Sequence, residues 1–420
     1  MGGRGSIDVG RHGGIHMAEA LLEIEGVEVR RGMGIVLSNF SLDLHSGDIL
    51  ILQGINGSGK STVIETASRL LPLEHGAVKH HGKMTIDSDG RRVHPRHPFG
   101  LVLQSNGAIG SETVDAHLST VAKLCNAELD LGALLDAYGL KHRSGDKIAY
   151  LSGGQARKVS VLGALLPAMV AESPTLVIMD EPDSGLDEQA ITTLMTHIQS
   201  LAAAGHAFLI ATHNPSMMAI ATHVHDLEKK IEQKPNDAKP HKRLGASAPA
   251  RWVSTRSAHR YARTTRSGLA RNGLTALMVL GCALALGDPA QLPSGLWETG
   301  GILAPAFAAG LTGDPTTHLL REHRAEDWWR AQSQPTPAAH GLGLAIGLVS
   351  TLAACYIYTG GVDLALLALG GIIGETAMLG TRLLHQSTRR LARPNAVFIR
   401  LLLPVFILPW ALIVSWASKW

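Results

Sequence analysis

The run Ile49–Thr62, ILILQGINGSGKST, constrains the fold more than any other part of the chain. Four apolar residues typical of a strand lead directly into a glycine-rich segment that fits the pattern GxxxxGK[ST], and helix-compatible residues follow it. A strand, a glycine loop and a helix in this order form the phosphate-binding P-loop. We therefore predict that this part of the chain has an α/β fold of the P-loop NTPase class.

The chemistry of this loop rests on its backbone. Glycines let successive N–H groups turn toward phosphate oxygens, and the following helix adds its positive N-terminal end. The pattern assigns Lys60 to the outer phosphates and the Ser61 hydroxyl to Mg²⁺. The predicted nucleotide-binding residues of the loop are Gly54, Asn56, Gly57, Ser58, Gly59, Lys60, Ser61 and Thr62.

A second apolar segment, Leu176–Met179, ends in the carboxylates Asp180 and Glu181. Carboxylates at the end of a buried strand are costly unless they meet a cation or polarise another group. Asp180 is therefore suited to hold Mg²⁺ through water, and Glu181 is suited to act as the general base for an attacking water.

Between these segments lies LSGGQ, residues 151–155, a turn that is expected to open a helix and to expose backbone N–H groups to phosphate. One chain cannot easily wrap two phosphate cradles around one nucleotide. We therefore expect two chains to associate head to tail, each covering the nucleotide bound by the other. The residues expected to do so are Ser152, Gly153, Gly154 and Gln155.

The motifs occur in an order that resembles ABC-type ATPases. They are Walker A at 54–62, a glutamine in LVLQS at 104, LSGGQ at 151–155, Walker B at 176–180 with its following glutamate, SGLD at 184–187 and a histidine in FLIATHN at 213. The resemblance implies ATP and Mg²⁺ as ligands, and a homodimer or heterodimer formed through the ATPase domains.

The same resemblance implies roles for single residues. Gln104 would sense the γ-phosphate and Mg²⁺, so that Ser61, Gln104 and Asp180 form the metal site. His213 would hold the γ-phosphate and Glu181, and Asp187 would contact the opposite subunit. Such ATPases usually place an aromatic ring against adenine, whereas this sequence has Arg31 in GVEVRRGMG, whose guanidinium could stack instead.

The composition changes sharply after this region, and long uncharged runs appear from Gly273 onward. We place about five apolar spans near 272–287, 296–313, 341–362, 364–384 and 401–418, against the roughly 20 residues needed to cross a bilayer. The second contains Pro305 and several glycines, which predicts a broken or re-entrant helix. The expected architecture is thus an α/β P-loop domain followed by an all-α transmembrane domain.

Charges between the spans predict the orientation. Arginines concentrate in 314–340 and 385–400, while 288–298 and 360–363 contain neither Lys nor Arg. The positive-inside rule then places the N-terminus and the ATPase in the cytoplasm of a multi-pass protein of the cytoplasmic membrane.

The predicted domain boundaries follow from these changes in composition. We expect a disordered glycine-rich leader at 1–16, an ABC-type ATP-binding domain at 17–226, a basic linker and interfacial segment at 227–271, and a transmembrane domain at 272–420. Residues 227–250 have little to bury and read as a flexible tether. The arginines of 251–271 could bind nucleic acid, but directly before an apolar segment we assign them to the anionic bilayer surface, with no nucleic-acid partner.

The segment LLREHRAEDWWR, Leu319–Arg330, interrupts the apolar spans with charges and two tryptophans. As a helix it would set Leu320 and Trp328 on an apolar face. It resembles the coupling helix through which membrane domains of ABC transporters contact the ATPase near the glutamine at 104. The alternative is a membrane-surface helix anchored by Trp328 and Trp329.

The arginine at position 31 and the membrane segment PAFAAGLTGDPTTHLLREHRAEDWWRAQSQPTPAAHGLGLAIGL are similar to the cytochrome c maturation haem exporter, with ATPase and first membrane subunit fused. That resemblance implies haem export, or release of a haem-loaded partner, together with other cytochrome c maturation membrane proteins. Five spans differ from the six expected in that family. The alternatives are a half-transporter that exports lipid, drug or polysaccharide, and a mechanochemical membrane ATPase that transports no solute.

Two further groups of residues call for an interpretation. Glu375 lies near the middle of the fourth span, where we favour a structural role inside the bundle over contact with a substrate or partner. Arg382, two turns further, is expected to reach the cytoplasmic side rather than to pair with Glu375. The histidines at positions 80 and 81 are adjacent in a probable strand and would point to opposite faces, and those at 94 and 97 flank prolines in a loop. We interpret them as solvent-exposed loop residues rather than as a shared metal site.

Overall fold

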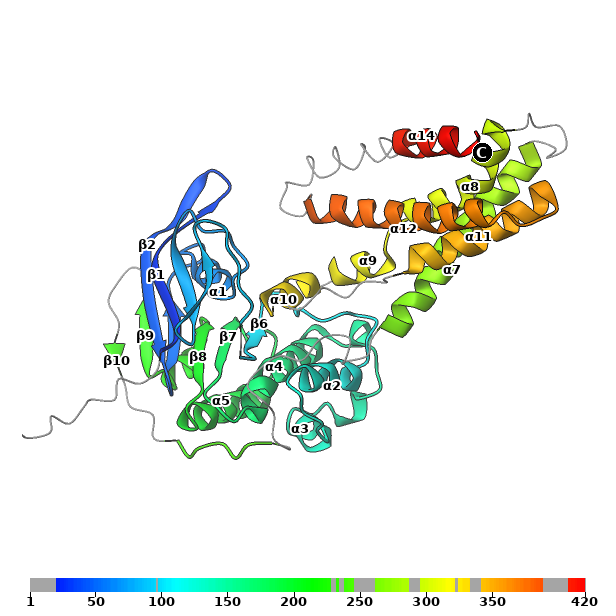
Figure 1. Cartoon of the computed structure of the whole chain (residues 1–420). Coiled ribbons are helices and arrows are strands. Elements are labelled where there is room, and N and C mark those ends of the chain that lie inside the picture. The colour runs from blue at the N-terminus through cyan, green and yellow to red at the C-terminus, as the bar shows by residue number, and fades with distance from the viewer. Residues whose placement is uncertain are drawn as a thin grey trace, which may run out of the picture. The chain divides into compact units, whose positions relative to one another are not determined.

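The computed structural model describes residues 20–95, 97–227, 232–233, 238–244, 261–286, 295–321, 324–332, 341–387 and 407–419 (Figure 1). The chain forms two compact units, one made of Met1–Gln104 with Val161–Arg251 and the other of Ser105–Ser160 with Trp252–Trp420. The expected leader at 1–16 lies outside the described residues.

The first unit is built on a sheet with the strand order β10-β9-β3-β8-β7-β6. The strands of this sheet are β3 (Ile49–Gln53), β6 (Gly100–Val102), β7 (Leu176–Asp180), β8 (Ala207–Ala211), β9 (His223–Asp226) and β10 (Glu232–Gln233). All neighbours pair in parallel except β10, which is antiparallel to β9. Strands β7 and β8 are buried along their whole length, as uninterrupted apolar runs in a covered parallel sheet should be.

The helices of this unit are α1 (Lys60–Ala67), α5 (Glu188–Ala203) and α6 (Pro215–Ala219). Helix α5 packs on β8 and buries Leu194, Ile198 and Leu201, which recur at the spacing of one helical face. A second, antiparallel sheet has the order β2-β1-β4-β5. Its strands are β1 (Ala20–Arg31), β2 (Gly34–His45), β4 (His75–His80) and β5 (Lys83–Asp87).

The second unit contains two groups of helices. Residues 105–160 form α2 (Val114–Leu124), α3 (Gly132–Ala137) and two 3₁₀ turns, Lys141–Arg143 and Ile148–Tyr150. Helix α4 (Gly153–Val170) starts in this unit and ends in the first. The C-terminal helices are α7 (Tyr261–Leu286), α8 (Leu296–Leu311), α9 (Pro315–Arg321), α10 (Ala325–Ala331), α11 (Leu342–Thr359), α12 (Leu364–Ser387) and α14 (Ile407–Ala417).

Three of the C-terminal helices are long and apolar enough to cross a membrane, through the windows Gly268–Ala285, Leu342–Thr359 and Leu364–Gln386. They correspond to the first, third and fourth predicted spans. Helix α8 has 16 residues, and its length of about 24 Å is less than the roughly 30 Å of a bilayer core. It continues through Pro305, so the expected break there is wrong. Of the fifth predicted span, the structure describes 407–417 as helix.

Glycines decide how α11 and α12 pack, and these helices lie side by side (Figure 1). A Cβ built on Gly343 would lie 2.6 Å from the carbonyl oxygen of Gly374, and one built on Gly347 would collide with the carbonyl of Gly370. The two backbones therefore touch, which only glycine permits, and small residues of this kind allow close approach of membrane helices.

Two boundaries differ from those expected. The predicted start of the transmembrane domain at 272 falls inside α7, which is one continuous helix from Tyr261. Residues 238–244 of the predicted flexible tether are attached to the first unit. There the His241 N–H donates to the Ser200 carbonyl at 2.7 Å, and the Arg243 guanidinium pairs with Glu172 at 3.0 Å. The tether prediction missed these contacts because they join residues far apart in sequence.

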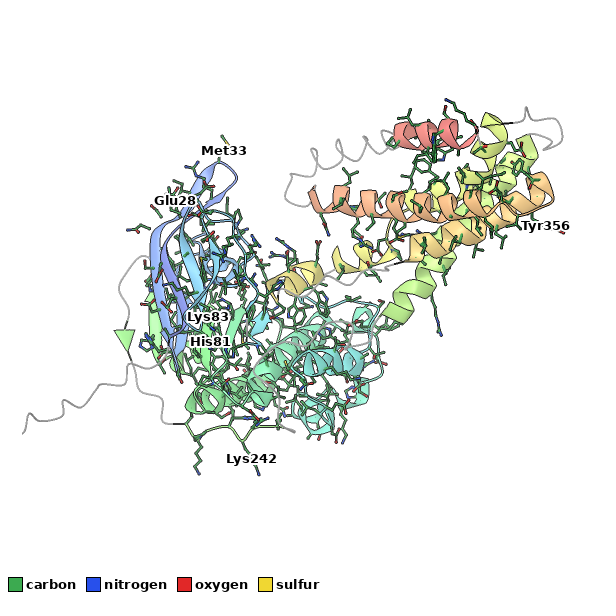
Figure 2. The ribbon with its side chains drawn as sticks, in the orientation of Figure 1. Glu28, Met33, His81, Lys83, Lys242 and Tyr356 are labelled. Carbon is green, nitrogen blue, oxygen red and sulfur yellow. The ribbon has the colours of Figure 1, made fainter. Side chains whose placement is uncertain are left out.

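The histidine interpretation was also wrong in part. His80 is buried, with its ring Nε2 2.9 Å from the Ala67 carbonyl oxygen, and burial lowers its pKa to about 3. His81, near Lys83 in the β4–β5 turn (Figure 2), stacks on His97 with ring centroids 4.2 Å apart. Within the described residues no group of three His, Cys, Asp or Glu side chains could hold a metal ion.

Candidate nucleotide-binding site

The parallel sheet gathers the predicted site at one edge of the first unit. The P-loop follows β3, His213 follows β8, Asp180 ends β7 with Glu181 next, and Gln104 follows β6. Because β3, β8, β7 and β6 are adjacent and parallel, their carboxyl ends meet at the same edge, where ligands of open α/β sheets bind. Four motifs that span more than a hundred residues of sequence thus reach one place.

The P-loop has a backbone that requires glycine. Gly54, Gly57 and Gly59 have φ values of 150°, 88° and 103°. A Cβ on Gly54 would lie 2.5 Å from the Ser58 Oγ, so space as well as conformation excludes a side chain there. The Lys60 ammonium lies over the loop, donating to the carbonyl oxygens of Gly54 at 2.6 Å and Ile55 at 3.0 Å. The cation is therefore held where phosphate oxygens would enter.

The two carboxylates at the end of β7 differ in their surroundings. Asp180 is only 3% exposed. Glu181 has a φ of 48°, in the left-handed region, which costs a residue other than glycine on the order of 1–3 kcal/mol and is concentrated at functional sites. The Glu181 N–H donates to the Ala211 carbonyl at 2.8 Å, which fixes this conformation against β8.

Sequence reasoning missed the link between β7 and β8 beyond these carboxylates. The Thr212 hydroxyl donates to Asp183 Oδ1 at 2.7 Å and accepts from the Asn214 N–H at 3.0 Å. These bonds surround His213, whose own side chain is exposed. The polar residues themselves are visible in the sequence, in EPDSG after β7 and in ATHN after β8. Which of them would meet depends on the order of the strands in the sheet.

Asp187, predicted to contact an opposite subunit, caps α5 by accepting from the Ala190 N–H at 2.8 Å. This bond satisfies one of the free N–H groups at the start of the helix.

The LSGGQ segment lies in the second unit. As predicted, it opens a helix, and the start of α4 is closed by two reciprocal bonds. The Ser152 N–H donates to Gln155 Oε1 at 3.0 Å, and the Gln155 N–H donates to Ser152 Oγ at 3.3 Å. Ser152 and Gly153 are exposed, and nothing lies within 4 Å of a Cβ built on Gly153. The turn therefore presents an open surface on which a phosphate could be bound.

Arg31 stands at the end of β1 and pairs with Glu65 of α1 at 2.7 Å. Glu65 was not expected to take part in the site. Its carboxylate is buried, whereas the Arg31 side chain remains 42% exposed. Met33, at the tip of the same β1–β2 hairpin (Figure 2), is fully exposed. The guanidinium is thus fixed at one edge and open on its remaining surface.

The segment LLREHRAEDWWR forms two short helices, α9 and α10, rather than the single helix predicted. Arg324, just before α10, has a φ of 59°, which ends regular helix at that point. Trp328 and Trp329 are 6% and 7% exposed, with their rings edge to face at 5.1 Å. A Cβ built on Gly107 would lie 3.4 Å from the Trp328 side chain. Helix α10 therefore packs against the chain three residues after Gln104.

Comparisons with known proteins agree with this geometry over the first half of the chain. Residues 37–184 match the family model described as ABC transporter. The glutamate transport ATP-binding protein GluA of Corynebacterium glutamicum is 28% identical over 199 residues, which are 46% of this chain and 80% of that protein. The macrolide export ATP-binding/permease protein MacB 1 of Escherichia coli O1:K1 is 30% identical over 196 residues, which are 45% of this chain but 30% of that protein.

Among solved structures, an ATP-binding subunit of an ABC transporter is 26% identical, with a TM-score of 0.42 over 51% of this chain and 90% of that one. The family match and the site agree. The chain therefore contains an ABC-type ATP-binding cassette, which hydrolyses ATP.

Proposed function

We propose that this cassette is the ATPase of an ABC transporter subunit whose membrane part lies in the same chain. Three helices of the C-terminal region have the length and apolar character of membrane spans. Positive charge alternates between the connecting segments as expected for a multi-pass protein of the cytoplasmic membrane with a cytoplasmic cassette. ATP hydrolysis would then act on the helices that the chain itself carries.

The proposed coupling of ATP hydrolysis to the membrane helices rests on one observation, the packing of Trp328 beside Gly107. A tryptophan that anchors a helix on a lipid surface should be exposed, whereas both tryptophans of α10 are buried. Gly107 lies three residues after Gln104, and Gln104 follows β6 at the nucleotide-binding edge. This supports the coupling role of α10 over the surface-anchor alternative, because a movement of the chain at Gln104 would shift Gly107, against which α10 packs.

The residues of the site divide the reaction between them. Lys60 and the loop N–H groups would hold the phosphates, Glu181 would take a proton from the attacking water, and His213 would fix the γ-phosphate and Glu181. A buried carboxylate such as Asp180 suits Mg²⁺, which Ser61, Gln104 and Asp180 would hold. That ion would neutralise charge on the outer phosphates.

The open turn at Ser152 supports a head-to-tail dimer. Ser152 and Gly153 are exposed, and the segment belongs to a different unit from the P-loop. In the proposed dimer, the Ser152–Gln155 turn of each chain covers the nucleotide on the other, either in a homodimer or in a heterodimer. Asp187 would keep its cap on α5 and contact the opposite subunit nearby.

For the transported species we favour the cytochrome c maturation role, in which the chain exports haem or releases a haem-loaded partner together with other membrane proteins of that system. The support is the resemblance of the segment around α9 and α10 and the arginine at position 31. The alternative of an exporter of lipid, drug or polysaccharide draws support from the macrolide export relative, although the chain covers only 30% of that protein. A mechanochemical ATPase without a solute is the other alternative.

Two experiments separate these roles. Purification in mild detergent should bring down cytochrome c maturation membrane proteins and haem absorbance, and the E181Q variant should hold both more firmly with ATP. If neither partner nor haem copurifies, while vesicles containing only this chain move a lipid or drug in an ATP-dependent way, the exporter alternative is correct. ATP-dependent release of a protein partner without any solute movement would identify the mechanochemical role.

A further inference from the structure

A cavity of about 410 Å³ lies among α8, α11, α12 and α14, where α11 ends and α12 begins. Ligand pockets for small molecules are typically about 300–1,000 Å³ and combine apolar walls with a few polar groups. This cavity has that character. Its walls include the apolar side chains of Ile302 and Leu366, the carboxylates of Glu298 and Asp363, the Thr299 hydroxyl and the Cys355 thiol.

Two carboxylates, those of Glu298 and Asp363, line the cavity. In the described part of the chain, neither Glu298 nor Asp363 forms an ion pair with a Lys, Arg or His side chain. Asp363 Oδ1 caps α12 by accepting from the N–H groups of Ala365 at 2.8 Å and Leu366 at 3.2 Å, and Glu298 lies in the first turn of α8. Helix termini offset only part of a full charge, so negative charge remains in a partly apolar cavity.

A hydroxyl also lines the cavity. The Thr299 side chain is 7% exposed. Among the residues that the structure describes, its hydroxyl has no hydrogen-bond partner, so it is available to a group in the cavity. Cys355, also lining the cavity, is 1% exposed. A group that enters the cavity could therefore satisfy a hydroxyl as well as two carboxylates.

The geometry argues against a metal ion. In the described ranges no three His, Cys, Asp or Glu side chains come close enough to hold one, although Glu298, Asp363 and Cys355 all line this cavity. A ligand must therefore be large enough to reach groups that lie apart. We propose that the cavity binds a small organic cation with an apolar body, whose charge is balanced by Glu298 and Asp363.

The first test measures binding to the full chain in lipid nanodiscs by equilibrium dialysis, with empty nanodiscs as background. The probe is tetraphenylphosphonium, and tetraphenylborate is the control of nearly equal shape and opposite charge. We expect saturable binding of the phosphonium only. E298Q and D363N should each weaken it about tenfold, as expected for the loss of one charged partner. Asparagine at 363 keeps the helix cap, and E326Q on α10 is the matched control.

The second test measures the electrostatic potential in the cavity from the reaction rates of charged thiol reagents. It does not depend on how a probe partitions into lipid. Val362 lines the cavity and is 52% exposed. In a chain whose native cysteines are replaced by alanine, V362C should react faster with a trimethylammonium thiosulfonate than with a sulfonate analogue, relative to free thiol. Adding E298Q and D363N should remove this preference, and tetraphenylphosphonium should slow both reagents. Lys419 lies next to the lining residue Ser418 and is the only Lys or Arg in the described turn that adjoins the cavity. The K419A variant tests whether its ammonium competes with tetraphenylphosphonium for the two carboxylates.

The outcomes are decisive for this site independently of transport. No saturable phosphonium binding, or binding that both carboxylate variants leave unchanged, overturns the proposal. A charge preference at V362C without saturable binding also overturns it, because that would show a negative surface and no site. None of these measurements uses ATP or haem, so their failure is distinguishable from failure of the proposed transport role.

Discussion

At the scale of single residues, Glu181 combines a chemical role with a strained backbone. Its φ of 48° is held by the bond from its N–H to Ala211, which belongs to the neighbouring strand. The side-chain carboxylate is therefore placed by the sheet and not by its own preference. The proposed role as general base depends on the carboxylate alone, which allows the strain and the chemistry to be separated by mutation.

We predict that E181Q binds ATP like the parental chain and hydrolyses it at least about a hundredfold more slowly, since general bases contribute roughly that factor or more. Lys60, Ser61 and Asp180 remain in place, so binding should not change. The measurement is ATP turnover beside binding of a fluorescent ATP analogue. K60A, which removes the cation over the loop, is the contrast and should lose binding. Parental turnover in E181Q would show that another group is the base.

The presence of a carboxylate at Glu375, near the middle of a membrane span, is explained by its hydrogen bonds to a neighbouring helix. Its carboxylate accepts from the N–H groups of Leu344 at 3.1 Å and Gly341 at 3.4 Å, at the start of α11. A carboxylate there is favoured by the free N–H groups and by the helix dipole. This supports a structural role inside the bundle. Arg382, expected to reach the cytoplasmic side, instead donates to the buried Asp314.

We predict that E375A lowers the free energy of unfolding by about 1 kcal/mol, the usual effect of losing a helix cap. E375Q keeps an acceptor and should lose less. Thermal unfolding of the full chain in detergent gives the measurement, and T376A, at an exposed neighbouring position, is the matched control. If E375A unfolds at the parental temperature while a bound partner or substrate is lost, the carboxylate serves contact and not capping.

At the scale of elements, α10 is the piece through which cassette and membrane helices communicate in the proposed function. Its two tryptophans form its buried face, while Asp327 pairs with Arg324 at 2.8 Å and Arg330 at 3.7 Å along its other side. Aromatic side chains usually dominate such contacts. The ion pairs on the partly exposed side should contribute much less.

We predict that W328A with W329A leaves nucleotide binding by the full chain intact but disconnects ATP hydrolysis from any partner-dependent or substrate-dependent stimulation. R330A, on the same helix, should have little effect. In a chain stripped of native thiols, cysteines at Trp328 and Ser105 should crosslink, with a yield that changes between ADP and ATP. No crosslink in any nucleotide state, with position 328 shielded by lipid, would return α10 to the role of a surface anchor.

At the scale of the whole molecule, the site is incomplete within one chain if the Ser152 turn serves a second copy. Ser152 and Gly153 of this turn are exposed, yet the P-loop motifs occupy the other unit. A dimer would complete two sites at once. Its formation should depend on ATP, because the nucleotide is the surface that both chains would share.

We predict a crosslink between chains that each carry one engineered cysteine. The native cysteines are first replaced by alanine. A chain with I55C, at an exposed P-loop position, is then mixed with a differently tagged chain carrying S152C, both in the E181Q background. Crosslinking should require ATP and should be absent when E128C, at another exposed position, replaces S152C. Because each chain has a single thiol, any product must join two chains. Equal yields with and without ATP, or with E128C, would contradict the head-to-tail arrangement.

The sequence by itself determined the nucleotide-binding edge. GINGSGKST, LVIMDE and LSGGQ specify local backbone shapes, because glycines at positive φ, apolar runs that end in carboxylates and a serine that caps a helix three residues before a glutamine have few alternatives. The predicted strands at Ile49 and Leu176, and the helix that LSGGQ opens, are accordingly present. These features depend on residues within a few positions of one another, so a pattern in the chain is enough to find them.

Tertiary structure alone decided which distant groups meet. Asp314 and Arg382 are 68 positions apart, and Glu375 reaches Leu344 across 31. The residues 238–244 dock on the cassette, and Trp328 lies against Gly107. In each case a polar or aromatic side chain is compatible with several surroundings. The partner is then whichever group the packing of strands and helices brings within reach, and no local pattern encodes that choice.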